Sequence, residues 1–313
     1  MINWGAVWMN RAGLRNKDKI KRIISVVISM IILGYTALMF IMPVLLTVSN
    51  SFMTKSEITA NYGKVFSDSG TSAVSSYIAD KVNLKIIPDK VSFGQYVTVL
   101  IKSPQYLLKF WNSVIYVVPI VLFQIAVSLG ASYSFARYRG PFRNTLFFVY
   151  IALMLMPYQV TLVPNYLVAD WMNILNTRWS IILPGIFSPF AVFILTKTMQ
   201  RIPSSIVEAA KIDGANEWQI FGKVFVPMSR NAIYSVALLL FIDYWNMVEQ
   251  PLIMLQNNED MHPLSVFLSK INAGEIGLAF AVAAIYMVLP LLLFLYSEDR
   301  ILEGIASSSA IKG

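Results

Sequence analysis

Residues 23–48 read IISVVISMIILGYTALMFIMPVLLTV and contain no charged side chain. About 20 consecutive apolar residues in a helix cross the hydrocarbon core of a bilayer. The stretch is too long for the core of a signal peptide and has no small-residue cleavage pattern. It therefore predicts a first transmembrane helix, and it sets the class of fold for the rest of the chain.

The remainder of the sequence repeats this pattern. The 313 residues are 57% hydrophobic and 13% charged, about half the charged fraction of a soluble domain. Five further apolar runs, separated by polar connections, span approximately residues 112–136, 145–167, 180–199, 231–255 and 276–296. The sequence thus predicts an all-α polytopic membrane protein with six transmembrane helices. The formal net charge of +8 lies in the connections and is not a nucleic-acid signal.

The distribution of Lys and Arg predicts the orientation. These residues are concentrated in 1–22, 137–143 and 197–230, whereas 168–179 and 256–275 carry one each. By the positive-inside rule, both termini and the 200–230 loop lie in the cytoplasm.

The expected organisation is a basic cytoplasmic segment, 1–22, followed by a transmembrane domain, 23–313. We expect a short interfacial helix in the basic segment. The domain includes an extracytoplasmic connection, 49–110, with a short strand or helix within 82–100, and a polar C-terminal tail, 297–313.

Several kinds of chemistry are absent from the sequence. It has no G-x-x-x-x-G-K-[ST] phosphate loop, no cysteine, and a single histidine, His262. Nucleotide binding through a P-loop, disulfides and a histidine-rich metal or haem site are therefore excluded. No nucleophile has a suitable histidine partner. We expect no catalytic residue, no metal site and no enzymatic activity in this chain.

Ionisable residues within the apolar runs are scarce, and Asp243 is the clear example. Asn246 and Glu249 follow at three and six residues, which would place all three on one face of a helix over 231–255. Asp243 either bonds to a neighbouring helix or lines the solute path. One polar helix face favours a cavity for a hydrophilic solute over a proton relay.

The 200–230 loop is polar and predicts two helices. Pro203, Ser204 and Ser205 are typical of a helix start, and Gly214 of a helix end. Apolar residues then recur at helical spacing on each piece, and Pro227 ends the second piece. The residues expected to form these two apolar faces are Ile206, Ala209, Ala210 and Ile212, then Trp218, Phe221, Val224 and Phe225. Such a helix-turn-helix could contact a partner or rest on lipid.

The order Glu208-Ala209-Ala210-x-x-Asp213-Gly214-Ala215 resembles the EAA loop of ABC-importer permeases. The tail that ends in Lys312 and Gly313 is similar to that of the carbohydrate, MalG-like branch. Further matching pairs lie in or next to the spans: Ser51-Phe52 after the first, Asn112-Ser113, Ala136-Arg137, Leu183-Pro184 and Trp245-Asn246. The connection 49–110 is longer than in that family, and Ser297-Glu298-Asp299-Arg300 is more acidic.

This resemblance implies a type I ABC importer permease fold in the cell membrane of a prokaryote. It implies a second, MalF-like permease subunit, two ATPase subunits that bind ATP and Mg²⁺, and an extracytoplasmic solute-binding protein. Glu208–Ala215 would be the helix that couples to the ATPase, and Lys312 and Gly313 would also contact it. The solute would be a sugar or oligosaccharide. The alternative is a stand-alone secondary transporter or channel for a polar solute, in which the loop has no evident task.

Overall fold

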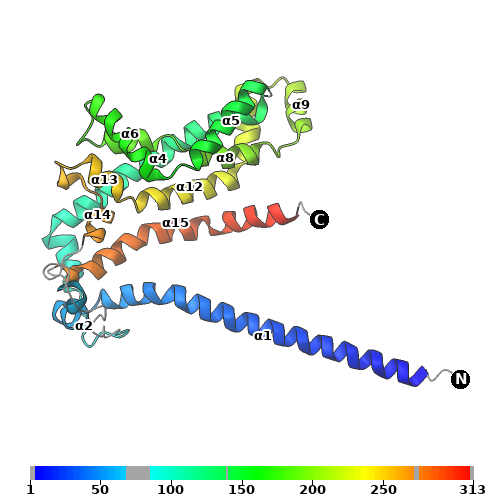
Figure 1. Cartoon of the computed structure of the whole chain (residues 1–313), viewed down its shortest axis with the longest axis horizontal. Coiled ribbons are helices and arrows are strands. Elements are labelled where there is room, and N and C mark those ends of the chain that lie inside the picture. Colours follow the sequence, from blue (N-terminus) through cyan, green and yellow to red (C-terminus); the bar gives the residue numbers. More distant parts are fainter. Residues whose placement is uncertain (1–3, 68–84, 139, 271–274, 311–313) are drawn as a thin grey trace. The chain divides into compact units, whose positions relative to one another are not determined.

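The computed structural model describes residues 4–67, 85–138, 140–270 and 275–310. All regular elements in these residues are helices (Figure 1). The chain divides into two units, Met1–Ser92 and Phe93–Gly313, which are described separately.

The first unit is dominated by helix α1, Trp4–Asn50. The expected short interfacial helix is wrong, because the basic stretch and the first apolar run form one uninterrupted helix. No proline precedes Pro43, and extending an existing helix is far more favourable than starting a new one. Pro43 lies inside the helix near its C-terminal end.

Helix α2, Lys55–Ser67, packs against the end of α1. Its Ile58 is buried, and the Asn50 amide donates to the Tyr62 hydroxyl at 2.8 Å. Residues 85–92 join the same unit, because the Asp89 backbone N–H donates to the Glu57 carboxylate at 2.7 Å. The connection 49–110 thus contains an ordered helix that the sequence patterns did not predict. In the 82–100 stretch, no strand is present among the described residues, and helix starts at Gly94.

The second unit is built around α4, Pro104–Arg137, which packs on α8, α12 and α14. Its other longer helices are α5, Pro141–Met154; α6, Tyr158–Trp171; α8, Pro189–Met199; α9, Ser204–Ile212; α12, Arg230–Trp245; and α15, Ile276–Ala310. Shorter helices connect them: α3, Gly94–Val97; η1, Thr98–Lys102; α7, Trp179–Gly185; α10, Glu217–Ile220; η2, Phe221–Phe225; α11, Val226–Met228; α13, Glu249–Met254; η3, Glu259–Met261; and α14, Leu264–Ser269.

Among the described residues, four helical stretches are long and apolar enough to cross a membrane. They are Arg22–Asn50, Pro104–Arg137, Trp179–Met199, which joins α7 and α8, and Gly277–Glu298. Two bent pairs qualify only when each is taken as one span, which gives up to six crossings. The sequence prediction of long apolar helices is confirmed, and three of the predicted spans need correction.

The predicted span 145–167 is not one straight helix. Helices α5 and α6 meet at 103°, because Pro157 has no backbone N–H and disfavours helical geometry in the residue before it. The predicted span 231–255 ends at Trp245, after which the chain turns and restarts as α13. The last helix is longer than predicted and continues to Ala310, through most of the stretch expected to be a tail.

The main core of the second unit is aromatic. The Trp245 ring is 1% exposed and stacks between Phe241 and Tyr286, with ring centroids 5.2 and 5.1 Å away. The Trp245 indole N–H donates to the Tyr286 backbone carbonyl at 3.3 Å. These contacts lock the C-terminal end of α12 onto α15.

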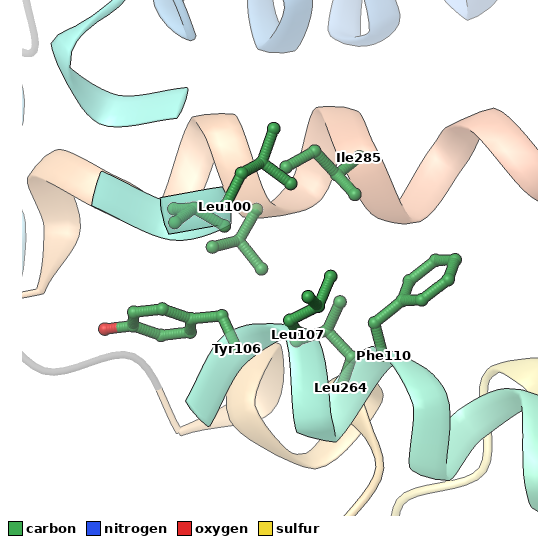
Figure 2. A pocket seen from close by; sticks show the side chains of 8 residues that line it. Leu100, Tyr106, Leu107, Phe110, Leu264 and Ile285 are labelled. Atoms are coloured by element: carbon green, nitrogen blue, oxygen red, sulfur yellow. The ribbon is translucent and has the colours of Figure 1, made fainter. Parts of the chain in front are cut away.

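A second packed junction joins η1, α4, α14 and α15 (Figure 2). Leu100, Tyr106, Leu107, Phe110 and Ile285 are among the residues that line a void of about 10 Å³ there. That volume is about enough for one water molecule, and its walls are apolar. The junction is therefore core packing and not a solute site.

Candidate functional site

The turn at Gly214 is a helix end closed by the backbone. Gly214 has φ +82°, in the left-handed region. Its N–H donates to the Lys211 carbonyl at 3.0 Å, and the Ala215 N–H donates to the Ala210 carbonyl at 2.9 Å. This pair of bonds is the Schellman motif. The predicted helix end at Gly214 is confirmed.

A capping box starts the next helix directly afterwards. The Asn216 side chain accepts from the Gln219 backbone N–H, and the Gln219 side chain accepts from the Asn216 N–H, both at 2.9 Å. The two motifs fix the angle between α9 and α10, since they leave one residue, Ala215, between the C′ and N-cap positions. Residues 200–230 therefore form a helix-turn-helix of fixed angle, which is called the coupling segment below after the role that the resemblance implies for it.

Helix α9 starts at the predicted place, but without the side-chain cap that serines there would provide. Pro203 occupies the N-cap position, no side chain caps the helix, and Ser204 is already helical. The second piece continues through η2, a π-helical turn, into α11. The helix passes Pro227 and breaks at Ser229, where α12 departs at 73°.

The coupling segment is anchored to α4 and α8 by a small apolar cluster. Val207, Ile220 and Phe225 are buried together with Tyr133 of α4 and Met199 of α8. The Tyr133 ring meets the Phe225 ring edge to face at 4.9 Å. The predicted apolar faces are therefore only partly correct. Val207 and Ile220, which the pattern omitted, form the buried side, and Ala210, Phe221 and Val224 are half-buried beside them.

The outward side contains the residues expected to face a partner. Glu208, Ala209, Asp213 and Gly214 are exposed, and Ala210 and Ala215 are half-buried. Two large apolar side chains from the predicted apolar faces also point outward: Ile212 is 86% exposed and Trp218 is 82% exposed. Neither residue belongs to the buried cluster that holds the segment on α4 and α8.

Glu217 links the two halves of the segment to α4, and the sequence patterns did not identify it. Its carboxylate accepts a hydrogen bond from the Tyr133 hydroxyl. It also pairs with the Lys211 ammonium at 3.0 Å and the Arg137 guanidinium at 3.8 Å. One carboxylate thus connects the last turn of α9, the first turn of α10 and the end of α4. In the sequence, Glu217 is only an acidic residue that follows the N-cap residue Asn216.

A cavity of about 900 Å³ opens at the other end of α12. Residues 153–165, 184–190 and 242–250 contribute its walls, including Asp243, Asn246 and Glu249. All three of these side chains are exposed. The structure brings together the three residues that the sequence grouped, and it does so at a concave surface.

The reason for this grouping differs from the prediction. Asp243 lies in α12, Asn246 caps its end, and Glu249 begins α13, so the three do not share one continuous helix face. The Asn246 amide donates to the Ile242 carbonyl at 2.8 Å, and its oxygen accepts from the Tyr286 hydroxyl at 3.3 Å. Much of the Asn246 side chain is thus engaged in the fold, whereas Asp243 and Glu249 project carboxylates into the cavity.

The connection after α13 is held on α4 by polar side chains. The Asn112 amide donates to the backbone carbonyls of Asp260 and His262, at 2.7 and 3.3 Å. Its oxygen accepts from the Arg178 guanidinium at 2.9 Å. The Tyr116 hydroxyl donates to the Met261 carbonyl at 2.9 Å. The connection is therefore a fixed cap, and burial lowers the pKa of His262 within it.

Two further predictions concern the C-terminal residues and metal binding. Lys312 and Gly313 lie outside the described residues. Among the described residues, no group of three or more His, Asp or Glu side chains is arranged to hold a metal ion.

Residues 125–303 match the family described as "Binding-protein-dependent transport system inner membrane component". The match covers more than half of the 313 residues and includes the whole coupling segment and the cavity. The chain belongs to this family and is a membrane permease component of such a system. Membership favours the importer subunit over the stand-alone transporter or channel.

Several curated proteins are similar along most of their length. The lactose transport system permease protein LacG of Rhizobium radiobacter is 29% identical, over 69% of this chain and 81% of that protein. The osmoprotective compounds uptake permease protein GgtD of Synechocystis sp. is 32% identical, over 64% and 69%. The arabinooligosaccharides transport system permease protein AraQ of Bacillus subtilis is 26% identical, over 74% and 83%.

One solved structure has the same fold. It is a chain in the crystal structure of a bacterial ABC transporter involved in the import of the acidic polysaccharide alginate. The TM-score is 0.71 at 20% identity, covering 87% of this chain and 95% of that one. The match extends beyond the family region and supports the predicted permease fold.

Proposed function

We propose that this chain is one of two permease subunits of an ATP-driven importer of a sugar or oligosaccharide. The observation that carries the proposal is the rigid coupling segment, anchored to a membrane helix, in a chain of the binding-protein-dependent family. The carbohydrate class rests on the names of relatives such as the lactose and arabinooligosaccharide permeases.

In this proposal, ATPase subunits bind ATP and Mg²⁺ and contact the exposed side of the coupling segment. Glu208–Ala215, together with Ile212 and Trp218, would supply the contact surface. These two exposed apolar side chains flank the Gly214 turn, where a docked ATPase subunit would cover them. Lys312 and Gly313 would reach the same partner.

A movement of the coupling segment would be transmitted to the membrane helices through direct packing contacts. The buried cluster around Tyr133 and the Glu217 contacts join the segment to the end of α4. Helix α4 in turn packs along α8 and α12, which carry cavity residues. ATP would act by binding one arrangement of the subunits more tightly than the other.

The cavity with Asp243, Asn246 and Glu249 would form this subunit's half of the solute path. A second, MalF-like permease would complete it, and an extracytoplasmic solute-binding protein would deliver the solute. The fixed connection over 256–264 suits contact with that protein, because its backbone is held at several points. Both termini and the coupling segment would then be cytoplasmic.

The test is gentle purification of the tagged chain from its native membrane. We expect an ATPase and a second permease to co-purify, and the complex to hydrolyse ATP faster when saccharide-loaded binding protein is added. A chain that purifies alone and conducts a polar solute without ATP would contradict the proposal. A control chain with the coupling segment scrambled should insert in the membrane and lose the ATPase.

A further inference from the structure

We propose that the cavity of this subunit admits neutral and amine-bearing saccharides and rejects saccharides that carry carboxylates. The inference rests on the proposed function, because it concerns the charge of the solute that passes this cavity. It is carried by the two carboxylates on the cavity wall and by the positions of the surrounding cations.

The walls combine groups suited to a saccharide. Gln159, Asn165 and Ser188 supply amides and a hydroxyl, and Tyr158 and Phe187 supply aromatic faces. Amides and hydroxyls pair with sugar hydroxyl groups, while aromatic rings cover the apolar faces of sugar rings. The volume of about 900 Å³ is within the usual range for a small-molecule site.

The charged groups on these walls are all acidic. Asp243 and Glu249 line the cavity, and none of the described residues that line it is Lys, Arg or His. The Glu249 carboxylate accepts one hydrogen bond, from the Gln159 amide at 3.3 Å. For Asp243, no ion pair within 4 Å is found in the part of the chain that the structure describes.

The cations of the neighbouring helices are directed elsewhere. The Lys197 ammonium of α8 lies over the Phe147 and Phe193 rings, 5.4 and 5.9 Å from their centroids. Arg178, before α7, donates to Asn112. Arg230 begins α12, about 20 Å along the helix from Asp243 at 1.5 Å per residue. Among the residues that the structure describes, no cation of this subunit therefore pairs with either carboxylate.

Uncompensated carboxylates in a membrane protein are stable where they face a water-filled path or a cation of another subunit. In the water-filled case, the acids attract cations and repel anions at short range. A neutral saccharide is unaffected by the sign of the field. A uronate would lose affinity, and a glucosamine oligomer would retain or gain it.

The experiment measures saccharide binding to the complete complex that purifies with this chain, in nanodiscs and without binding protein. Binding protein is left out because its own selectivity would mask that of the membrane subunits. The probes are trimers of glucose, glucuronate and glucosamine with the same linkage, in α-1,4 and β-1,4 series. Dissociation constants come from equilibrium dialysis at low ionic strength, where charge effects are largest.

We expect the glucuronate trimer to bind at least tenfold more weakly than the glucose trimer, and the glucosamine trimer at least as tightly. In the double variant Asp243→Asn with Glu249→Gln, the difference between glucose and glucuronate should fall to threefold or less. The matched control is Asp170→Asn, an exposed aspartate of α6 that does not line the cavity. It should leave the wild-type ratio unchanged.

Glucuronate binding within threefold of glucose in the wild type would overturn the inference and leave the proposed function intact. That result would indicate that cations of the second permease neutralise the two acids. An unchanged ratio in the double variant would also overturn it. Failure of all neutral and amine-bearing trimers to bind, in both linkage series, would count against the saccharide class itself.

Discussion

Replacing Gly214 by valine should uncouple transport while the protein still inserts in the membrane. Gly214 has φ +82°, and a Cβ built there would meet no atom within 4 Å. The effect of the substitution therefore comes from the backbone and not from crowding. A left-handed conformation costs an ordinary residue about 1–2 kcal/mol, and a β-branched residue is a genuine outlier there.

Few interactions stabilise the turn against that strain. Its two closing bonds, Gly214 to Lys211 and Ala215 to Ala210, contribute a net of about 1 kcal/mol each. A strain of about 1–2 kcal/mol therefore approaches what the two bonds supply, and it lowers the ratio of native to non-native turn roughly 5- to 30-fold. The apolar anchor should keep α10 in place, because it holds Ile220 and Phe225 against Tyr133 of α4 and does not use the Gly214 side of the turn.

The assay is saccharide-stimulated ATP hydrolysis and uptake by the reconstituted complex, with membrane insertion measured in parallel. Activity should decrease in the order Gly, Asn, Ala, Val at position 214, because Asn tolerates the left-handed region better than Ala. The matched control is Gly222→Val, since Gly222 is helical, has open space around it and has no positive φ. Wild-type uptake by Gly214→Val, or an equal loss in Gly222→Val, would refute the reasoning.

Three other predictions concern the same chain. Glu217→Gln should weaken the attachment of the coupling segment by about 1 kcal/mol, since the pairs are partly exposed; faster hydrogen exchange over 204–228 would reveal it, and Tyr133→Phe should reproduce part of the effect. Trp218→Ala should reduce co-purification of the ATPase without changing the thermal stability of the chain, because the ring is 82% exposed; an unchanged yield of ATPase would contradict the docking surface. A protease site inserted at Asn258 should be cut only from the extracytoplasmic side, and cleavage from the cytoplasm would reverse the proposed topology.

The coupling segment shows which features of a site can be predicted from neighbouring residues alone. Its helix end at Gly214 follows from the backbone freedom of glycine, and its restart after Asn216 follows from side-chain capping, so both were predictable from neighbouring residues. Its buried face was not. Whether Val207 or Ile206 faces inward depends on where Tyr133 lies, and that residue is distant in the chain.

The cavity shows the same division for the candidate solute path. Sequence spacing grouped Asp243, Asn246 and Glu249 as one helix face, although the helix ends at Trp245. The stacking of Trp245 on Tyr286 holds the end of α12 on α15, and no local pattern encodes that contact. The three residues come together because α12 and α13 form one wall of a cavity.

The sequence by itself determined the membrane class, the long apolar helices and the turn chemistry of Glu208–Ala215. These properties depend on hydrophobicity and backbone preference, which act over a few residues. The tertiary structure alone decided the contacts of Glu217 with Tyr133 and Arg137 and the grouping of the two acids on the cavity wall. Each depends on which distant side chains meet, because packing and ion pairing are set by proximity in space and not by proximity in the chain.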